Sequence, residues 1–241
     1  EKNIVFSKGT PRIKKKLKGK VLSLLTGGGG NSNYWHWLFD VLPRTQIVNN
    51  FLKSENINYY LFPDLREKFQ IETLNLLGIP KEKRISSQNY RHVLAEEIIV
   101  THHPYNILND PDKDSLNIPY WIISFLRKKF LKENKNLNKF PKKIYIDRSD
   151  SKSGHKEMRT ILNENEIKKT LYDLGFESLI LSNYHFSDQV KIFNEAENIV
   201  GLHGAGFANI VFCKPNTKIL ELQSNTAGAI IQNISEKNKL N

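Results

Sequence analysis

The segment from residue 33 to residue 44 carries the first side chains suited to acid–base chemistry. His36 and Asp40 are four positions apart in it, which places them on one face of a helix. A carboxylate beside an imidazole orients the ring, fixes its tautomer and raises its basicity. The pair is therefore a candidate general base, suited to deprotonating a sugar hydroxyl through either Asp40 or His36. The alternative interpretation is a structural hydrogen bond within an ordinary helix.

Aromatic and basic side chains surround this pair in the sequence. Tyr34, Trp35 and Trp37 fall in one short stretch, and Arg44 follows Asp40 by a further helical turn. Aromatic rings pack against the C–H faces of sugars, and small-molecule pockets combine such apolar walls with a few polar groups. We expect Tyr34, Trp35 and Arg44 to bind the acceptor, which is the molecule whose sugar hydroxyl is deprotonated.

A second segment, residues 199–209, reads Ile-Val-Gly-Leu-His-Gly-Ala-Gly-Phe-Ala-Asn. Its small residues follow a predicted strand and open a helix, so the amides near Gly204, Ala205 and Gly206 are able to approach an anion closely. His203 would donate a hydrogen bond to the same group. The segment lacks the Gly-Lys-Ser/Thr end of a P-loop and the full spacing of a dinucleotide fingerprint. A tight turn that needs glycine for its backbone angles is the alternative.

Alternating strands and helices must position both segments, and this alternation predicts an α/β fold. In the first part, four glycines, 27–30, separate a strand from a long helix that Pro43 should kink or divide. A polar connector, 132–139, lies within the second part, which resembles a Rossmann-like half. We place the domain boundary after residue 117, giving domains 1–117 and 118–241. The predicted strands are 21–26, 59–62, 92–101 (one strand or a pair), 143–147, 178–181, 199–202 and 218–222, and the predicted helices 34–52, 65–77, 120–131, 164–174, 187–196 and 205–212.

The amino-acid composition is that of a globular protein. The 241 residues are 39% hydrophobic and 25% charged, as in a globular protein, and no apolar run is long enough to span a membrane. The single cysteine, Cys213, excludes an internal disulfide and a multi-cysteine metal site. The net charge of +11, with five lysines between residues 14 and 20, favours anionic partners, although biased residue usage would also produce it. We expect a cytoplasmic protein, peripheral to the inner face of the membrane.

Three ordered motifs together resemble glycosyltransferase family 61. They are Tyr34 to Arg44, Ile144 to Arg148 with Asn163-Glu164, and Gly201 to Asn209 followed by Phe212, Pro215 and Ile219 to Leu222. The resemblance implies an inverting transferase of two Rossmann-like domains, GT-B-like, that uses a nucleotide sugar without a metal motif. The first domain would hold the acceptor and the second the donor.

The resemblance also implies the roles of individual residues. Arg148 would bind the donor phosphates, which suits its bidentate fork, and Glu221 would accept hydrogen bonds from the ribose. An ordinary surface charge at a strand end is the alternative for Glu221. We expect no cofactor and no metal, a UDP-sugar as the favoured donor, and a glycan or lipid-linked acceptor of the capsule or lipopolysaccharide type. The predicted donor-binding residues are Arg148, His203, Gly204, Ala205, Gly206, Asn209 and Glu221.

Two other functions remain open from the sequence. A nucleotide-dependent oxidoreductase also needs a glycine turn, and it carries an acidic residue that binds the ribose about 20 positions after that turn. Glu221 lies at about this distance from Gly201. A basic module for RNA or anionic lipid would use the lysines of residues 14–20. No nucleic-acid motif accompanies that charge, so we expect no nucleic-acid partner. His102 and His103 lack further ligands at metal spacing.

Overall fold

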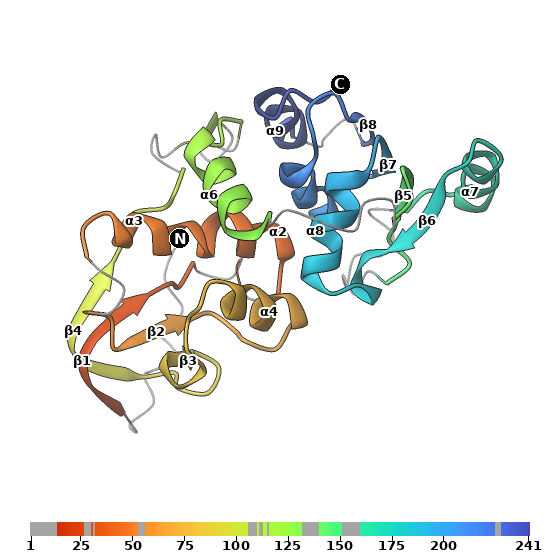
Figure 1. Cartoon of the computed structure of the whole chain (residues 1–241). Coiled ribbons are helices and arrows are strands. Elements are labelled where there is room, and N and C mark those ends of the chain that lie inside the picture. Colours follow the sequence, from red (N-terminus) through yellow and green to blue (C-terminus); the bar gives the residue numbers. More distant parts are fainter. Residues whose placement is uncertain are drawn as a thin grey trace. The chain divides into compact units, whose positions relative to one another are not determined.

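The computed structural model describes residues 14–26, 30, 32–52, 56–105, 110, 113–114, 116–131, 140–150, 160–224 and 228–241. The chain divides into two compact units, Glu1–Pro104 and Tyr105–Asn241 (Figure 1). This division lies ahead of the boundary after residue 117 that the sequence suggested, and it puts residues 105–117 with the second unit. The glycines 27–29 and the connector 132–139 lie outside the described residues.

Unit 1 is built on a four-stranded parallel sheet in the order β3-β2-β1-β4. The segment at 92–101 forms one strand, not a pair. Above the sheet, one helical segment changes type along its length, from α2 through the π-helix η1 to α3. The elements of unit 1 are β1 Lys15–Ser23, α2 Tyr34–His36, η1 Trp37–Val41, α3 Pro43–Asn49, β2 Tyr59–Phe62, α4 Lys68–Leu76, the 3-10 helix η3 Lys81–Lys83, β3 Arg84–Ser86 and β4 Val93–Val100.

The basic stretch of the sequence forms the first part of β1, which begins at Lys15 and not at Val21 as predicted. Lys20 pairs with Glu97 of the neighbouring strand β4, with Nζ 3.2 Å from Oε2. Lys15 lies over the ring of Tyr90, 5.0 Å from its centroid. Most of this basic stretch therefore belongs to a sheet, and the charge of Lys20 is paired within it.

The order of the strands in unit 1 creates a switch point between β1 and β4. The chain runs from β1 outward through β2 to β3, and then returns to the other side of β1 to form β4. Ser23, the last residue of β1, pairs with Val100, the last residue of β4. Segments that leave these two strands therefore start side by side at the carboxyl edge of the sheet, where open parallel sheets bind their ligands.

Unit 2 also holds a parallel sheet of four strands, in the order β6-β5-β7-β8. Its switch point lies between β5 and β7, where Ile146 pairs with Gly201. Arg148 follows β5 and His203 follows β7, so both begin at this point. The elements are α6 Tyr120–Phe130, β5 Lys143–Asp147, α7 Glu164–Asp173, β6 Glu177–Ile180, the 3-10 helix η5 Leu181–Asn183, α8 Phe186–Glu195, β7 Asn198–Leu202, the 3-10 helix η6 Ala205–Phe212, β8 Lys218–Leu222 and α9 Ile230–Lys237.

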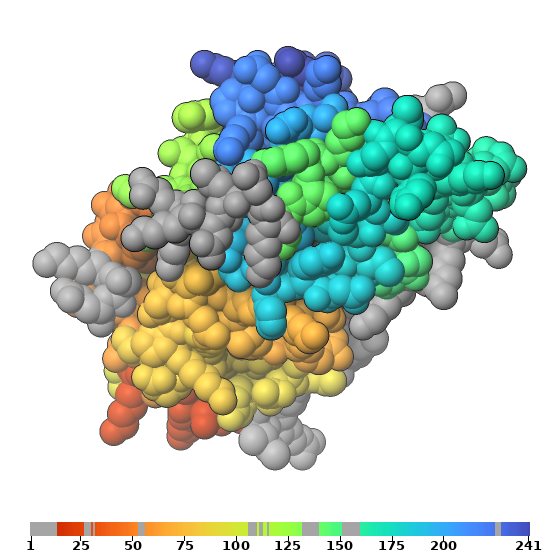
Figure 2. Space-filling view, turned by 45° about the vertical axis from the view of Figure 1, so that its right-hand side comes forward, coloured from red at the N-terminus to blue at the C-terminus, as the bar shows by residue number. Residues whose placement is uncertain are grey.

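The core of unit 2 gathers around η6, whose Phe207 to Phe212 are all buried. The carbonyl groups at the end of η6 accept hydrogen bonds from two other helices. Asn238 at the end of α9 donates to Ile210 and Val211 at 3.0 Å each. Arg127 of α6 donates to Val211 and Cys213. By contrast, α7 buries none of its residues and lies at the surface (teal in Figure 2). The helix α9 was not predicted from the sequence.

Two parallel sheets of four strands, each with its own helices, confirm the predicted α/β class of two Rossmann-like, GT-B-like domains. Within the described part of the chain, no helix combines the length and apolar character needed to cross a membrane.

Candidate active site

His36 and Asp40 lie on a helix whose middle is a π turn. The Asn33 side chain starts this helix by accepting hydrogen bonds from the amides of Trp35 at 2.9 Å and His36 at 3.4 Å. Further along, the amide of Leu42 bonds the carbonyl of Trp37 five residues earlier, and Pro43 then opens α3. Proline has no N–H and crowds the preceding turn, so a wider turn accommodates it without ending the helix. The segment thus changes type at Pro43, where an irregularity was predicted.

A glycine lets the loop from β1 pass close to this helix. The amide of Gly30 donates to Thr26 Oγ1 at 3.1 Å. A Cβ at Gly30 would lie 2.5 Å from that oxygen and 2.7 Å from Cγ2 of Val41. A larger residue at position 30 would therefore press on the side chains of Thr26 and Val41.

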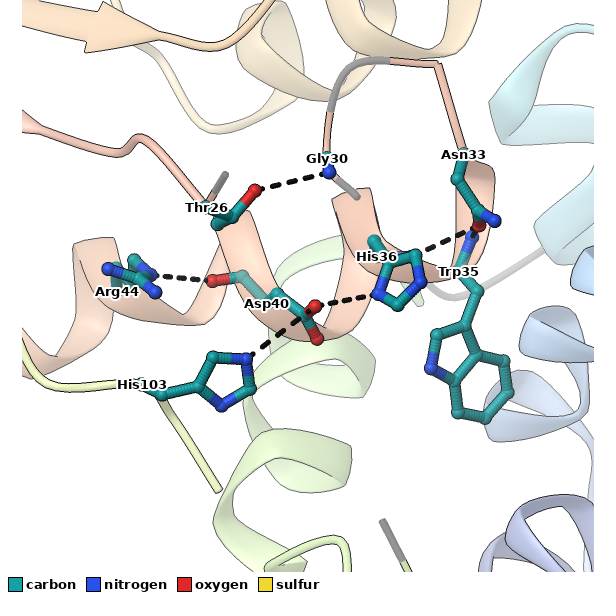
Figure 3. A network of polar contacts seen from close by, with 8 residues as sticks. All are labelled: Thr26, Gly30, Asn33, Trp35, His36, Asp40, Arg44 and His103. Atoms are coloured by element: carbon teal, nitrogen blue, oxygen red, sulfur yellow. Dashed lines mark hydrogen bonds and ion pairs between the residues drawn. The ribbon is translucent and has the colours of Figure 1, made fainter. Parts of the chain in front are cut away.

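His36 and Asp40 form a hydrogen-bonded pair with unequal exposure (Figure 3). The Nδ1 atom of His36 lies 2.7 Å from Oδ2 of Asp40. The His36 side chain is 40% exposed and that of Asp40 only 7%. The hydrogen bond to Asp40 raises the pKa of His36, an effect that burial opposes and the negative charge of Asp40 reinforces. The geometry suits His36 to meet a substrate through Nε2 while Asp40 orients the ring.

A second histidine approaches the same carboxylate. Nε2 of His103 lies 3.6 Å from Oδ2 of Asp40, and Figure 3 shows the two imidazoles on different sides of that oxygen. His103 belongs to the segment that leaves β4, whereas His36 and Asp40 follow β1. The sequence offered His103 only as a weak metal candidate. Its place three residues after a strand at the switch point is the signal that would have found it, had the strand order been known.

Arg44 binds backbone near Asp40 instead of its carboxylate. Its Nε donates to the carbonyl of Asp40 at 2.9 Å, and Nη1 donates to the carbonyl of Thr101 at 3.4 Å. The residue is 6% exposed, so it links η1 to the segment leaving β4 from within the core. Its role in binding an acceptor stays a prediction.

The aromatic residues of this segment pack against other aromatic rings of unit 1. Trp35 is buried and stacks on Phe39 with ring centroids 4.4 Å apart. Tyr34 is half-buried and meets Phe69 edge to face at 5.1 Å. Trp37 lies wholly in the core. Acceptor binding by Tyr34 and Trp35 stays a prediction.

In unit 2, Arg148 lies against the turn that follows β7. Its Nη1 donates to the carbonyl of His203 at 2.5 Å. A Cβ at Gly204 would lie 2.8 Å from both Cζ and Nη1 of Arg148, so glycine leaves the space that the guanidinium occupies. The strand order thus brings together Arg148, His203 and Gly204, which lie far apart in the sequence.

His203 also forms a pair with a carboxylate. Its Nδ1 lies 2.5 Å from Oε1 of Glu221, which stands on β8 beside Gly201. In the neutral ring, donation from Nδ1 to Glu221 leaves the lone pair on Nε2. The predicted contact of Glu221 with a ribose is not tested by this arrangement.

The remaining residues that are predicted to bind the donor sugar nucleotide lie at the start of η6 or in its buried part. The amide of Phe207 makes the first bond of this helix, to Gly204, so the amides of Ala205 and Gly206 come before the hydrogen-bonded part. Asn209 is fully buried and donates to Gln189 Oε1 at 3.1 Å and to the Gly206 carbonyl at 3.3 Å. Its position supports the turn from the core, and its donor contact stays a prediction.

Asp147, which the sequence did not single out, holds the turn that carries Arg148. Its carboxylate accepts the Ser149 amide at 2.9 Å and the Ser178 hydroxyl at 3.0 Å, and it lies 2.8 Å from Nζ of Lys168. Burial raises the pKa of Asp147, but hydrogen bonds from Lys168, Ser149 and Ser178 together outweigh burial and lower it. Asp147 therefore stays ionised and anchors the end of β5.

Neither site resembles a metal centre in the described ranges: no group of three histidine, cysteine, aspartate or glutamate side chains there is placed to hold a metal ion. Both sites do fall within one family match, since residues 34–220 match the profile of the family described as Glycosyltransferase 61. The chain belongs to glycosyltransferase family 61. This confirms the resemblance drawn from the sequence motifs.

A similar protein is a plant transferase. A β-1,2-xylosyltransferase from Arabidopsis thaliana is 28% identical over 98 residues. That alignment covers 34% of this chain and 18% of the plant protein, so the chain matches only a small part of its relative.

Proposed function

We propose that this family 61 protein transfers a sugar from a nucleotide sugar to a hydroxyl group of an acceptor, with inversion at the anomeric carbon. The observation that carries the proposal is the exposed imidazole of His36, hydrogen-bonded to the buried carboxylate of Asp40. Such a pair takes up a proton readily while the carboxylate keeps the ring in one orientation.

The reaction is a single displacement. Nε2 of His36 takes the proton of the acceptor hydroxyl, and the oxygen forms a bond to the anomeric carbon. The bond from that carbon to the nucleoside diphosphate breaks on the opposite face, and its electrons leave with the diphosphate. Asp40 stabilises the imidazolium that results, as a buried carboxylate next to histidine commonly does.

Unit 2 supplies the donor site. The guanidinium of Arg148 would neutralise part of the charge of the diphosphate without a metal step, and the amides of Ala205 and Gly206 would donate hydrogen bonds to it. His203 would donate from Nε2 in the protonated form of its ring. Preorganised donors of this kind contribute about 3 kcal/mol each to the transition state. Glu221, held close to this turn by His203, would accept a hydrogen bond from the ribose of a UDP-sugar.

The acceptor we propose is a glycan or lipid-linked sugar of the capsule or lipopolysaccharide type, modified at the inner face of the membrane. The exposed lysines 14, 15 and 16, at the start of β1, would attract anionic lipid. Replacing all three with serine should reduce binding to vesicles that contain anionic lipid, and unchanged binding would remove this part of the proposal.

Family membership supports a transferase over the two alternatives. An oxidoreductase accounts for the glycine turn alone, and a basic polyanion-binding module accounts for the lysines alone. Neither accounts for the His36–Asp40 pair together with a match over residues 34–220.

Thermal unfolding with a panel of UDP-sugars, GDP-sugars and NADH tests the proposal directly. A ligand that binds only the folded protein stabilises it by about 2.7 kcal/mol at 100 times its Kd. We expect one class of nucleotide sugar to raise Tm, and that donor to release nucleoside diphosphate when an acceptor is added. Stabilisation by NADH alone, without any by nucleotide sugars, would refute the proposal.

A further inference from the structure

Two imidazoles share one oxygen of Asp40, and they do so through different ring atoms. His36 approaches Oδ2 with Nδ1 at 2.7 Å, and His103 approaches it with Nε2 at 3.6 Å. The two rings come from separate parts of unit 1, His36 from the helix after β1 and His103 from the segment after β4. Their meeting follows from the pairing of β1 with β4, whose ends lie side by side.

One carboxylate, two imidazoles and one guanidinium lie together in this cluster. The carboxylate of Asp40 faces His36 and His103, and the guanidinium of Arg44 binds the backbone carbonyl of Asp40 itself. Arg44 keeps its charge across the range in which imidazoles titrate.

A base is most useful when its proton affinity matches the working pH. The hydrogen bond and charge of Asp40 raise the pKa of His36, so a larger share of the rings is protonated at a given pH and fewer are free to accept a proton. Nε2 of His103 lies 3.6 Å from Oδ2, and a proton on that nitrogen places positive charge near the oxygen, which draws part of the negative charge away from His36. The direction is the same for the protonated ring and for the neutral tautomer that carries its proton on Nε2.

We propose that His103 is a positioning residue that shares Oδ2 of Asp40 with His36 and thereby sets the pH at which His36 becomes an unprotonated base. The proposal rests on the proposed function in assigning His36 as the base. The contact itself does not depend on that function, because it is a relation among three side chains of the folded protein.

Replacement of His103 separates a positioning role from a merely structural one. The full chain carrying His103→Leu loses the ring nitrogen that lies near Asp40, whereas His103→Gln keeps an amide N–H at about the position of Nε2. His103→Asn keeps an amide that is too short to reach, and His102→Leu is a control on the adjacent exposed histidine. NMR titration of the His36 ring is the first measurement, and the pH–rate profile of transfer is the second.

We expect the titration midpoint of His36 to rise in His103→Leu by roughly half a pH unit or more, since nearby charges shift an imidazole by such amounts. The acid limb of the rate profile should move upward with it. His103→Asn should behave like His103→Leu, and His103→Gln and His102→Leu like the wild type. If His103→Leu does not fold, the comparison of His103→Asn with His103→Gln carries the test.

An unchanged or lowered midpoint in both His103→Leu and His103→Asn would overturn the inference, as would equal behaviour of the Gln and Asn variants. The two proposals fail separately. If no nucleotide sugar supports transfer, the proposed function fails while the His36 midpoints still decide the role of His103. If transfer occurs and the midpoints do not move, only the role of His103 is wrong.

Discussion

Nδ1 of His36 lies 2.7 Å from Oδ2 of Asp40, and the two side chains differ in exposure, 40% against 7%. The buried partner carries the charge, and the exposed partner carries the nitrogen that reaches solvent. This difference in exposure is the reason why we propose His36 as the base and Asp40 as its partner, a choice that their spacing in the sequence left open. The relation also makes the behaviour of the pair depend on pH.

Replacing Asp40 with Asn should slow transfer and shift the pH dependence. Loss of the carboxylate removes the main cause of the raised pKa of His36, so that pKa should fall and the acid limb should move to lower pH. Transfer should drop about 100-fold or more, because the ring loses its orienting partner. Rate measurements from acid to neutral pH check this, with His102→Gln as the control.

The same variant makes a prediction about stability. The folded-state pKa of His36 is raised, so the pair stabilises the protein fully below the unperturbed value of 6.5 and loses this contribution as pH rises through the folded-state pKa. The difference in Tm between wild type and Asp40→Asn should therefore be larger at about pH 6 than at about pH 8.5. A difference that grows with pH would contradict the assignment of His36 as the raised group.

Gly204→Ala should weaken donor binding through Arg148. The added Cβ would lie 2.8 Å from the guanidinium and displace it, while the extended backbone at Gly204, with φ of 162°, tolerates alanine. We expect affinity for a nucleoside diphosphate to fall about tenfold, corresponding to about 1.4 kcal/mol, and Arg148→Ala to have at least that effect. Calorimetric titration measures both, and Gly228→Ala, where no heavy atom lies within 4 Å of the new Cβ, is the matched control. Unchanged affinity in Gly204→Ala would show that Arg148 does not contact the donor from this position.

Two buried threonines of unit 1 should respond differently to valine. The Thr73 hydroxyl accepts from the indole N–H of Trp37 at 2.9 Å and donates to the carbonyl of Phe69 at 2.7 Å. Thr73→Val should cost about 1–3 kcal/mol, because a buried N–H in η1 loses its partner. Within the described residues the Thr101 hydroxyl is buried without a hydrogen-bond partner. Thr101→Val should stay within about 0.5 kcal/mol of wild type or exceed it, and urea unfolding of both variants checks the contrast.

The sequence by itself determined the local features of this protein. Alternating apolar strands and amphipathic helices predicted the α/β class. The four-residue spacing predicted that His36 and Asp40 meet, because neighbours on one helical face depend only on helix geometry. The glycines after β7 predicted a strand-to-helix turn, which η6 confirms, and the family motifs predicted a membership that the match over residues 34–220 confirms.

Only the tertiary structure decided which distant segments meet. His103 reaches Asp40 because β4 pairs with β1, and Arg148 reaches the turn at His203 because β7 pairs with β5. Neither pairing follows from the sequence of a single strand, since the apolar pattern of a parallel strand does not depend on which strand lies next to it. Strand order is settled by crossover connections and by the burial of both faces of a sheet, and these depend on the whole chain.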